Sequence, residues 1–477
     1  MKKNIVVLIS DQMQKRAVLD DKRCIMPNLR RLQEDSVTME NAHAVNAICS
    51  PSRASLISGL LPHNHGMVDC THTVPAYRAD FSNKIKTMPE ALKDEGYHLA
   101  YYGKWHIERT YDLSRYGFED YETEKTIKSS KLTSLGKVQV KTDGYKDYTL
   151  CGVYKEGEEA SEEHFIYSKA IDFIDKVKDD ERPFCVFAST YAPHDPYFAP
   201  NEIFSLYDEN DFPLPSDWND HVCKLPDIYS RLHSVWRDLS ESDLRKAIMC
   251  YYACCTLVDK QVGKLVSYLK EKGIYDDTLI VFLSDHGDMC GSHGLFCKGV
   301  PAYEEVYNIP LVMKFPENRY AGVKETAYVD TCDIMPTIFE SCGINWLANR
   351  IDGSSFIPYL TGSKNRHDSF TVSEFFGQRY SYTQRIVWHK GIKYVFNAFS
   401  VDELYDLNKD PLEKENLVDD SEYADVKHEI CKLLWDRVVK TDDWSFRDAQ
   451  YCMHRILPSG PNLGSVGKGF ALYNKTM

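Results

Sequence analysis

The sequence of 477 residues contains no pair of cysteines in C-x-x-C spacing, although it has 15 cysteines. Their odd number and irregular spacing exclude a disulfide framework and a cysteine-based zinc knuckle as the basis of the fold. Several of them, such as Cys185, Cys254 and Cys332, lie within apolar runs. We therefore expect most of the cysteines to be small core residues of a protein in a reducing compartment.

A long apolar run is also lacking, because no stretch approaches the ~20 residues that a membrane-spanning helix needs. The first residues, MKKNIVVLISDQ, contain only a short apolar run, whereas a secretory signal has a longer one and a small-residue cleavage site. We expect a cytoplasmic protein with no membrane partner. The formal net charge of -14 also argues against nucleic acid as a general partner.

The sequence does contain a regular alternation of apolar runs with amphipathic segments. Four runs predict strands of a mainly parallel sheet that is buried on both faces, namely Asn4–Ser10, Tyr97–Gly103, Phe184–Thr190 and Thr278–Ser284. The longest predicted helix begins after Ser240, which forms a capping pair with Asp243, and it stops at Gly273. This order predicts an α/β fold with a large, doubly wound sheet between helices.

A composition shift near residues 362–365 predicts a boundary between a large domain (residues 1–365) and a smaller one (residues 366–477). The smaller domain is predicted to be α+β, with three antiparallel strands and a helix around Ala424–Val439. The tail from Trp444 has little periodicity and is compatible with contacts between subunits of a homo-oligomer. The polar segment Tyr121–His164 is predicted to be a surface insertion.

Polar residues follow each of the four predicted strands. They are Asp11 and Gln12 after the first strand, Lys104 and His106 after the second, His194 after the third, and Asp285 and His286 after the fourth, with Lys298 further on. Each residue alone has an ordinary explanation as a turn, a cap or a solvated side chain. Because ligands collect at the carboxyl edge of parallel strands, the set together predicts a basic pocket beside a metal site. That combination suits a tetrahedral oxyanion.

A further segment, Cys49-Ser50-Pro51-Ser52-Arg53, predicts a helix start with a cysteine at its first turn. Proline is tolerated there, since the N–H that it lacks has no partner within a helix at that position. The free N–H groups and the positive end of the helix dipole favour an anion beside Cys49. A buried cysteine with no chemical role is the alternative.

This segment resembles the signature of type I sulfatases, in which the cysteine is oxidised to formylglycine. The resemblance extends over most of the chain in the order of the family, through GYHLAYYGKWHI, YAPHDPY, TLIVFLSDHGDMCGSHGLFCKG and ELYDLNKDPLEKENL. It implies an alkaline-phosphatase-like fold, a catalytic large domain and a smaller C-terminal α+β subdomain. It also implies hydrolysis of a sulfate ester by a covalent mechanism, and a formylglycine-generating maturation enzyme as a partner.

The resemblance implies a role for each residue of the predicted pocket. Asp11, Gln12, Asp285, His286 and residue 49 would hold a divalent cation. Arg53 would hold the formylglycine hydrate, and Lys104 and Lys298 would bind the sulfate oxygens. His106 would be the base that releases sulfate, and His194, with Lys298, would protonate the leaving oxygen.

Two departures from the usual family pattern concern the metal. Many members have aspartate at the position of Gln12 and asparagine at the position of His286. A nitrogen ligand favours manganese or another transition ion over calcium. By resemblance, Ca2+ is the first expectation, with Mn2+ or Mg2+ as alternatives.

Two other functions stay open on the sequence. Phosphonate monoester and phosphodiester hydrolases use the same nucleophile and share the Asp-Gln and Asp-His variants, but they lack the pair Lys104 and His106. A non-catalytic protein that binds sulfated ligands would keep Cys49 as a thiol. The substrate is expected to be a small molecule or a sulfated mono- or disaccharide, which would contact His65, Cys70 and Asp195.

Overall fold

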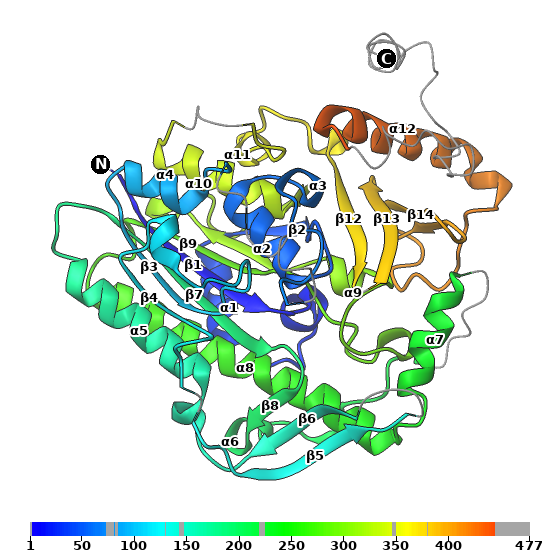
Figure 1. The fold of residues 1–477 in the computed structure, drawn as a ribbon, viewed down its shortest axis with the longest axis horizontal. Helices are drawn as coiled ribbons and strands as arrows, with labels where there is room; N and C mark the ends of the chain where they lie inside the picture. The colour runs from blue at the N-terminus through cyan, green and yellow to red at the C-terminus, as the bar shows by residue number, and fades with distance from the viewer. Residues whose placement is uncertain are drawn as a thin grey trace.

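The computed structural model describes residues 2–72, 81, 84–128, 130–142, 147–218, 225–345, 350–378 and 380–443. An eight-stranded sheet in the order β11-β2-β10-β9-β1-β7-β3-β4 forms the centre of the molecule (Figure 1). Neighbouring strands are parallel except where β10 pairs with β9 and β2. The strands are β1 (Asn4–Asp11), β2 (Val37–His43), β3 (His98–Gly103), β4 (Asp120–Thr123), β7 (Phe184–Pro193), β9 (Thr278–Ser284), β10 (Leu311–Lys314) and β11 (Val323–Asp330).

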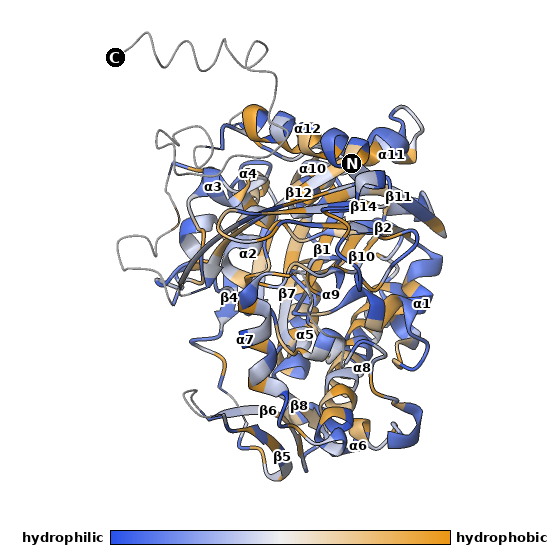
Figure 2. Ribbon diagram, turned by 90° about the vertical axis from the view of Figure 1, so that its right-hand side faces the viewer, coloured by the Kyte–Doolittle hydropathy of each residue, from blue (hydrophilic) through white to orange (hydrophobic). Residues whose placement is uncertain are grey.

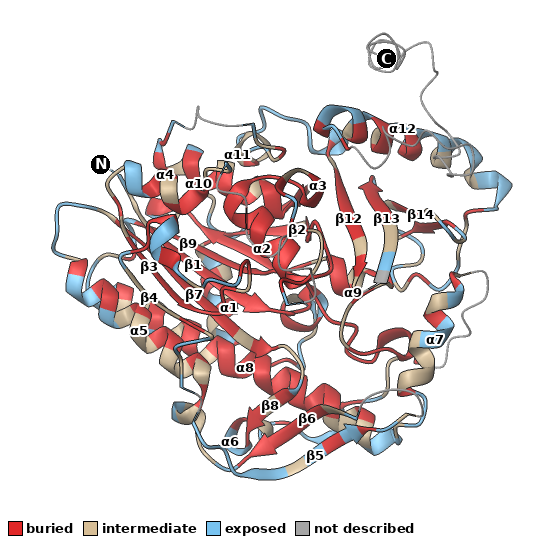
Figure 3. Ribbon diagram, in the orientation of Figure 1, coloured by how far each residue is buried: buried red, intermediate tan, exposed pale blue. Residues whose placement is uncertain are grey.

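The central strands are apolar along their whole length because both faces of the sheet are covered. In β1, Val6 and Leu8 belong to one hydrophobic cluster, whereas Ile5, Val7 and Ile9 belong to another. Successive side chains of a strand point to opposite faces, so a continuous apolar run is what a strand between two helical layers requires. Figure 3 shows these central strands as buried, whereas exposed segments lie on the outside of the molecule, as in parts of the outer helices and in β5 (Ser134–Val140).

Helices form the two covering layers. One cluster unites the sheet with α1 (Pro27–Glu34), α5 (Glu162–Val177) and α8 (Glu241–Glu271), and the other unites it with α2 (Cys49–Ser58), α4 (Met88–Asp94) and α10 (Ile334–Cys342). The shorter helices are α3 (Pro62–His65), α6 (Asn201–Phe204), α7 (Asp227–Trp236), α9 (Glu304–Tyr307) and α11 (Ile357–Leu360). The predicted α/β fold is therefore confirmed.

The four predicted strands all occur in this sheet, with ends that differ by three residues at most. The long predicted helix is α8, and the Ser240 hydroxyl accepts a hydrogen bond from the Asp243 N–H at 3.1 Å. Gly273, just after this helix, has a φ of +69°, the left-handed conformation that ends helices.

The polar segment at residues 121–164 is more than a surface insertion. It contains β5 (Ser134–Val140) and β6 (Tyr148–Tyr154), which form a three-stranded sheet with β8 (Tyr197–Pro200). Leu150 and Cys151 are fully buried in the same cluster as α8. The sequence prediction missed this sheet because charged residues such as Asp147, Lys155 and Glu156 flank the short apolar run of β6.

A separate sheet of four antiparallel strands follows, made of β12 (Phe370–Gln378), β13 (Tyr380–His389), β14 (Ile392–Asn397) and β15 (Glu403–Asp406). Helix α12 (Ala424–Thr441) packs on it and alternates hydrophobic and hydrophilic turns in Figure 2. The N–H of Glu374 donates to the carbonyl of Val45 at 2.7 Å, so β12 is bonded directly to the segment before Cys49. The predicted tail contact from Trp444 lies outside the described residues.

Candidate active site

Cys49 is the first residue of α2 and is buried at the carboxyl edge of the central strands. Its Sγ lies 3.1 Å from His286 Nε2 and 3.7 Å from Asp11 Oδ1. The first hydrogen bond of the helix runs from Ser52 to Ile48, so Pro51 falls in the turn whose N–H groups have no intrahelical partner. The proline therefore costs the helix no hydrogen bond, as the sequence predicted.

Two carboxylates meet beside Cys49 because their strands are neighbours in register. Ser10 of β1 pairs with Ser284 of β9, which brings the following residues, Asp11 and Asp285, side by side. The Nε2 atom of His286 lies 3.7 Å from Asp11 Oδ1 and 3.8 Å from Asp285 Oδ1. One potential ligand atom from each of Asp11, Cys49, Asp285 and His286 falls in a cluster within 4.8 Å.

The tautomer of His286 suits a metal ligand. Its Nδ1 lies 2.9 Å from the carbonyl oxygen of Gly287 and must therefore carry the proton. That assignment leaves the lone pair on Nε2, which faces the carboxylates, and it is the usual arrangement around a ligating histidine. Two carboxylates and one imidazole are a suitable donor set for Ca2+ or Mn2+.

Arg53, one turn along α2, forms ion pairs with both carboxylates. Its Nε donates to Asp285 Oδ2 at 2.7 Å, and its Nη2 donates to Asp11 Oδ2 at 3.1 Å. Nη1 donates to the carbonyl of Lys104 at 2.7 Å, which joins the end of β3 to the same group. Burial alone raises the pKa of Asp11, but the charges of Lys104, His194 and Arg53 outweigh it, and the pKa is lowered.

The two lysines of the predicted anion site converge on Cys49. The Lys104 amino group forms an ion pair with Asp11 Oδ2 and lies 3.6 Å from Cys49 Sγ. Burial lowers the pKa of both Lys104 and Lys298, yet the negative charges of Asp11 and Cys49 raise it overall, so both stay cationic. Burial raises the pKa of the Cys49 thiol, but Lys104, Lys298 and His286 lower it well below its ordinary value. The site is therefore built for negative charge.

Gln12, which was expected to be a metal ligand, directs its side chain to other partners. Its amide oxygen accepts a hydrogen bond from the Lys298 amino group, and its Nε2 donates to Asp195 Oδ1 at 2.8 Å and to Asp288 Oδ2. The oxygen expected at the metal is thus used by Lys298 in this structure. Sequence reasoning missed Asp288, although it stands two residues after His286 in the same motif.

The Asp195 carboxylate is likewise occupied, since it accepts from Gln12 and from the Tyr148 hydroxyl. His194 lies beside it, with Nδ1 donating to the Asp195 carbonyl at 2.5 Å. Burial raises the pKa of Asp195, but the charges of His194 and Lys298 lower it overall. The Asp195 carboxylate therefore orients Gln12, and its expected contact with substrate stays a prediction.

His106 stands at the other side of the site and has a φ of +51°. Its backbone is fixed by the carboxylate of Glu124, which accepts from the N–H groups of Trp105 at 2.7 Å and His106 at 3.0 Å. Its Nε2 lies 3.9 Å from Cys70 Sγ. Cys70 is therefore beside the predicted base, where sequence reasoning expected substrate contact.

His65 does not lie at the rim of the site. Its Nε2 is 2.9 Å from the Ser55 hydroxyl, and its Nδ1 accepts from the Met67 N–H at 3.1 Å. Burial, and then the neighbouring charge of His63, lower the pKa of His65 to about 3. Both nitrogens are used within the protein, so the expected substrate contact is corrected to a packing role behind α2.

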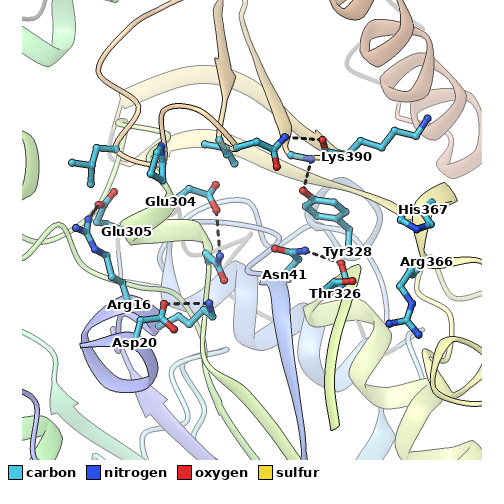
Figure 4. A pocket seen from close by; sticks show the side chains of 17 residues that line it. Arg16, Asp20, Asn41, Glu304, Glu305, Thr326, Tyr328, Arg366, His367 and Lys390 are labelled. Carbon is cyan, nitrogen blue, oxygen red and sulfur yellow. Dashed lines mark hydrogen bonds and ion pairs between the residues drawn. The ribbon is translucent and has the colours of Figure 1, made fainter. Parts of the chain in front are cut away.

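A cavity of about 900 Å3 lies elsewhere, between the edge of the large sheet and the four-stranded sheet (Figure 4). Its lining includes Arg16, Glu305, Tyr328, Arg366 and Lys390. Figure 4 shows Arg16 turned toward Glu305, and the two form an ion pair at 3.1 Å. None of the predicted site residues lines this cavity.

The comparisons with known proteins decide the family. A sequence model described as Sulfatase matches residues 3–344, which is more than half of the chain, and one described as N-sulphoglucosamine sulphohydrolase, C-terminal, matches residues 291–440. The chain belongs to the sulfatase family. It is a sulfuric ester hydrolase with an alkaline-phosphatase-like fold, as the resemblance implied. Sulfatases generally use a metal ion and formylglycine.

Several relatives of this sulfatase match over most of their length. An uncharacterized sulfatase of Escherichia coli is 27% identical over 89% of this chain and 84% of its own. An N-acetylglucosamine-6-O-sulfatase of Bacteroides thetaiotaomicron is 26% identical over 86% of this chain and 81% of its own. The solved phosphonate monoester hydrolase of Agrobacterium radiobacter shares the fold, with a TM-score of 0.76, 21% identity and coverage of 92% and 96%. Within the described parts of this sulfatase, no helix has the length and apolar character of a membrane span.

Proposed function

We propose that this sulfatase hydrolyses the sulfate ester of a small molecule or of a mono- or disaccharide, with residue 49 as formylglycine. The position of Cys49 is the observation that carries the proposal. Its side chain lies within 3.1–3.7 Å of His286, Lys104 and Asp11. A nucleophile at this point lies next to the groups that can stabilise the negative charge of the sulfate during the reaction.

Asp11, Asp285 and His286, with the oxygen of residue 49, would hold a divalent ion, and Ca2+ is the first expectation. When bound, the ion would offset the negative charge of the sulfate and favour ionisation of the attacking hydroxyl. Arg53 fixes both carboxylates from the opposite side, at 2.7 and 3.1 Å. The carboxylates therefore keep their orientation before the ion arrives.

The remaining residues bind the ester and move protons. Lys104 and Lys298 would bind the sulfate oxygens as buried cations. His194 would donate a proton to the leaving alcohol, and His106 would accept one when sulfate is released. Formylglycine supplies a hydrated aldehyde, whose second hydroxyl makes that release feasible, whereas a thiol offers no such group.

The relatives support a sulfated sugar or a similarly small ester as the substrate class. One of them is named as an N-acetylglucosamine-6-O-sulfatase and another as a choline-sulfatase. The buried thiols of Cys185 and Cys254 suit a reducing, cytoplasmic location. A formylglycine-generating enzyme in that compartment would convert Cys49.

The test is a comparison of kcat/KM for an aryl sulfate and for an aryl phosphonate monoester. The protein would be produced together with a formylglycine-generating enzyme, and mass spectrometry would give the converted fraction of residue 49. We expect a preference for the sulfate that is lost in Cys49→Ala. Equal turnover by Cys49→Ala would refute the role of residue 49.

A preference for the phosphonate ester would instead support the second candidate, a phosphonate monoester hydrolase. The structural likeness to the Agrobacterium enzyme favours that alternative at the level of the fold. The presence of Lys104 in contact with Asp11 and Cys49, and of His106 beyond it, favours the sulfatase.

A further inference from the structure

Three potential metal ligands outside the Asp11 cluster meet around the His106 ring. The Nε2 atom of His106 lies 3.2 Å from His72 Nδ1 and 3.9 Å from Cys70 Sγ. The two imidazole rings are stacked, with centroids 5.4 Å apart. All three ligand atoms lie within 4.8 Å of one another. Cys70 is buried, His106 is half-buried and His72 is exposed, so the group opens to solvent on one side.

The spacing of these atoms matches the edges of a zinc tetrahedron. Zinc binds imidazole nitrogen at about 2.0–2.1 Å and thiolate sulfur at about 2.3 Å, which places neighbouring ligands roughly 3.3–3.6 Å apart. The separations of 3.2 Å and 3.9 Å lie on either side of that range, so shifts of a few tenths of an ångström would bring both into it. One sulfur and two nitrogens are the donors that zinc and related ions prefer, whereas calcium prefers oxygen.

We propose that Cys70, His72 and His106 form a second metal site, which takes Zn2+ or a similar transition ion and thereby inhibits the enzyme. The inhibitory role rests on the proposed function, in which His106 is the base. On binding, the Cys70 thiol releases its proton to solvent and a metal–sulfur bond forms, while each imidazole donates its lone pair. A neutral imidazole has a single basic lone pair, so a metal-bound His106 has none left to accept a proton.

The second site adjoins the first, because the His106 side chain also forms a hydrogen bond with Cys49. It shares no ligand with the cluster of Asp11, Cys49, Asp285 and His286. Burial, and then the negative charge of Cys49, raise the pKa of Cys70 to about 12, so the ion must displace a proton.

The binding test uses Co2+ as a spectroscopic probe in the Cys49→Ala protein with excess Ca2+. Cys49 is absent there, so a thiolate-to-cobalt absorption band has to come from another cysteine. We expect the band in Cys49→Ala, its loss when Cys70→Ser is added, and its retention when Cys342→Ser is added as a matched control. A missing band in Cys49→Ala, or a band that survives Cys70→Ser, would overturn the site.

The inhibition test uses the converted wild-type enzyme in excess Ca2+. Added Zn2+ should abolish turnover, and a chelator selective for zinc over calcium should restore it. The variant His72→Ala should need at least about tenfold more Zn2+ for half-inhibition, since it lacks one of three ligands. The same sensitivity in wild type and His72→Ala would place the zinc at Asp11 and overturn the inhibitory role. If the protein showed the cobalt band but hydrolysed no sulfate ester, the proposed function would be contradicted, whereas the second metal site would still be supported.

Discussion

The amino group of Lys298 donates a hydrogen bond to the side-chain oxygen of Gln12. Through its Nε2, the same buried amide donates to Asp195 at 2.8 Å and to Asp288. One neutral side chain thus joins a lysine of the anion site to carboxylates that follow β7 and β9. Where many sulfatases carry an aspartate, this chain carries a residue that can both accept from the lysine and donate to the carboxylates.

Replacement of Gln12 by leucine should therefore reduce kcat more than it changes KM. Lys298 would lose its acceptor, and Asp195 would lose a donor, so the lysine would no longer be fixed over the sulfate. We expect a loss of about 10–100-fold, the usual cost of removing a partner that orients a ligand. Steady-state kinetics on an aryl sulfate, normalised to the converted fraction of residue 49, gives the measurement. Unchanged kcat in Gln12→Leu, with Gln33→Ala as the remote control, would contradict this role.

Removal of the metal should destabilise the protein. Asp11, Asp285 and His286 place their ligand atoms close together in the interior, so an ion that binds only the native state adds to stability. At a Ca2+ concentration of about 100 times Kd the gain is ~2.7 kcal/mol. Thermal unfolding with Ca2+, with Mn2+ and with a chelator measures it.

The variant Asp285→Asn should show a much smaller increase in Tm on addition of the ion. Asp179→Asn, at an exposed position, serves as the control and should respond like wild type. An equal response in all three proteins would place the ion outside this cluster. A larger shift with Mn2+ than with Ca2+ would reflect the nitrogen ligand His286.

Much of this site could be predicted from the sequence, because the order and register of the strands determine where the residues that follow them lie. Asp11 and Asp285 follow strands that are neighbours, and the match of Ser10 with Ser284 brings them together. The alternation of strands and helices was likewise visible in the apolar runs. Prediction succeeded for the elements that local sequence patterns specify, such as β1, β9 and the start of α8.

The orientation of side chains could not be read in the same way. The sequence shows that Gln12 follows Asp11, but only the packing of β6 beside β8 brings Tyr148 to Asp195, whose carboxylate also accepts from the Gln12 amide. His65 looked like a rim residue because it stands in a polar stretch, yet its ring fits behind α2 against Ser55. These contacts join residues that are far apart in the chain or that a short helix turns inward. Local periodicity carries no information about either.

Lys104→Met should lower kcat/KM for an aryl sulfate by about 10²–10³-fold, the cost of losing one group that stabilises charge in the transition state. The lysine is in contact with both Asp11 and Cys49, so its loss removes a positive charge at the reacting group. Lys104→Arg should rescue little, because the larger guanidinium does not fit the position of a compact ammonium. Lys176→Met, on the exposed face of α5, is the control. A decrease below threefold in Lys104→Met, with unchanged conversion of residue 49, would contradict the role.

Acid should destabilise the protein partly through His65. The buried ring has a pKa of about 3, below the ordinary 6.5 for histidine, because burial and the charge of His63 oppose its protonation. Between these two values the unfolded chain binds a proton that the native protein does not, so the free energy of unfolding decreases as the pH falls below about 6.5.

His65→Gln removes that proton and should flatten the decrease. At most, the slope should fall by about 1.4 kcal/mol per pH unit, the value for one proton. Urea unfolding of wild type and variant at several pH values from about 7 to about 5 measures the slope. His367→Gln, at an exposed position, should leave it unchanged. If the two histidine variants gave the same slope as wild type, the ring of His65 would have to be protonated in the native protein, and its contacts with Ser55 and Met67 would need a different hydrogen-bond assignment.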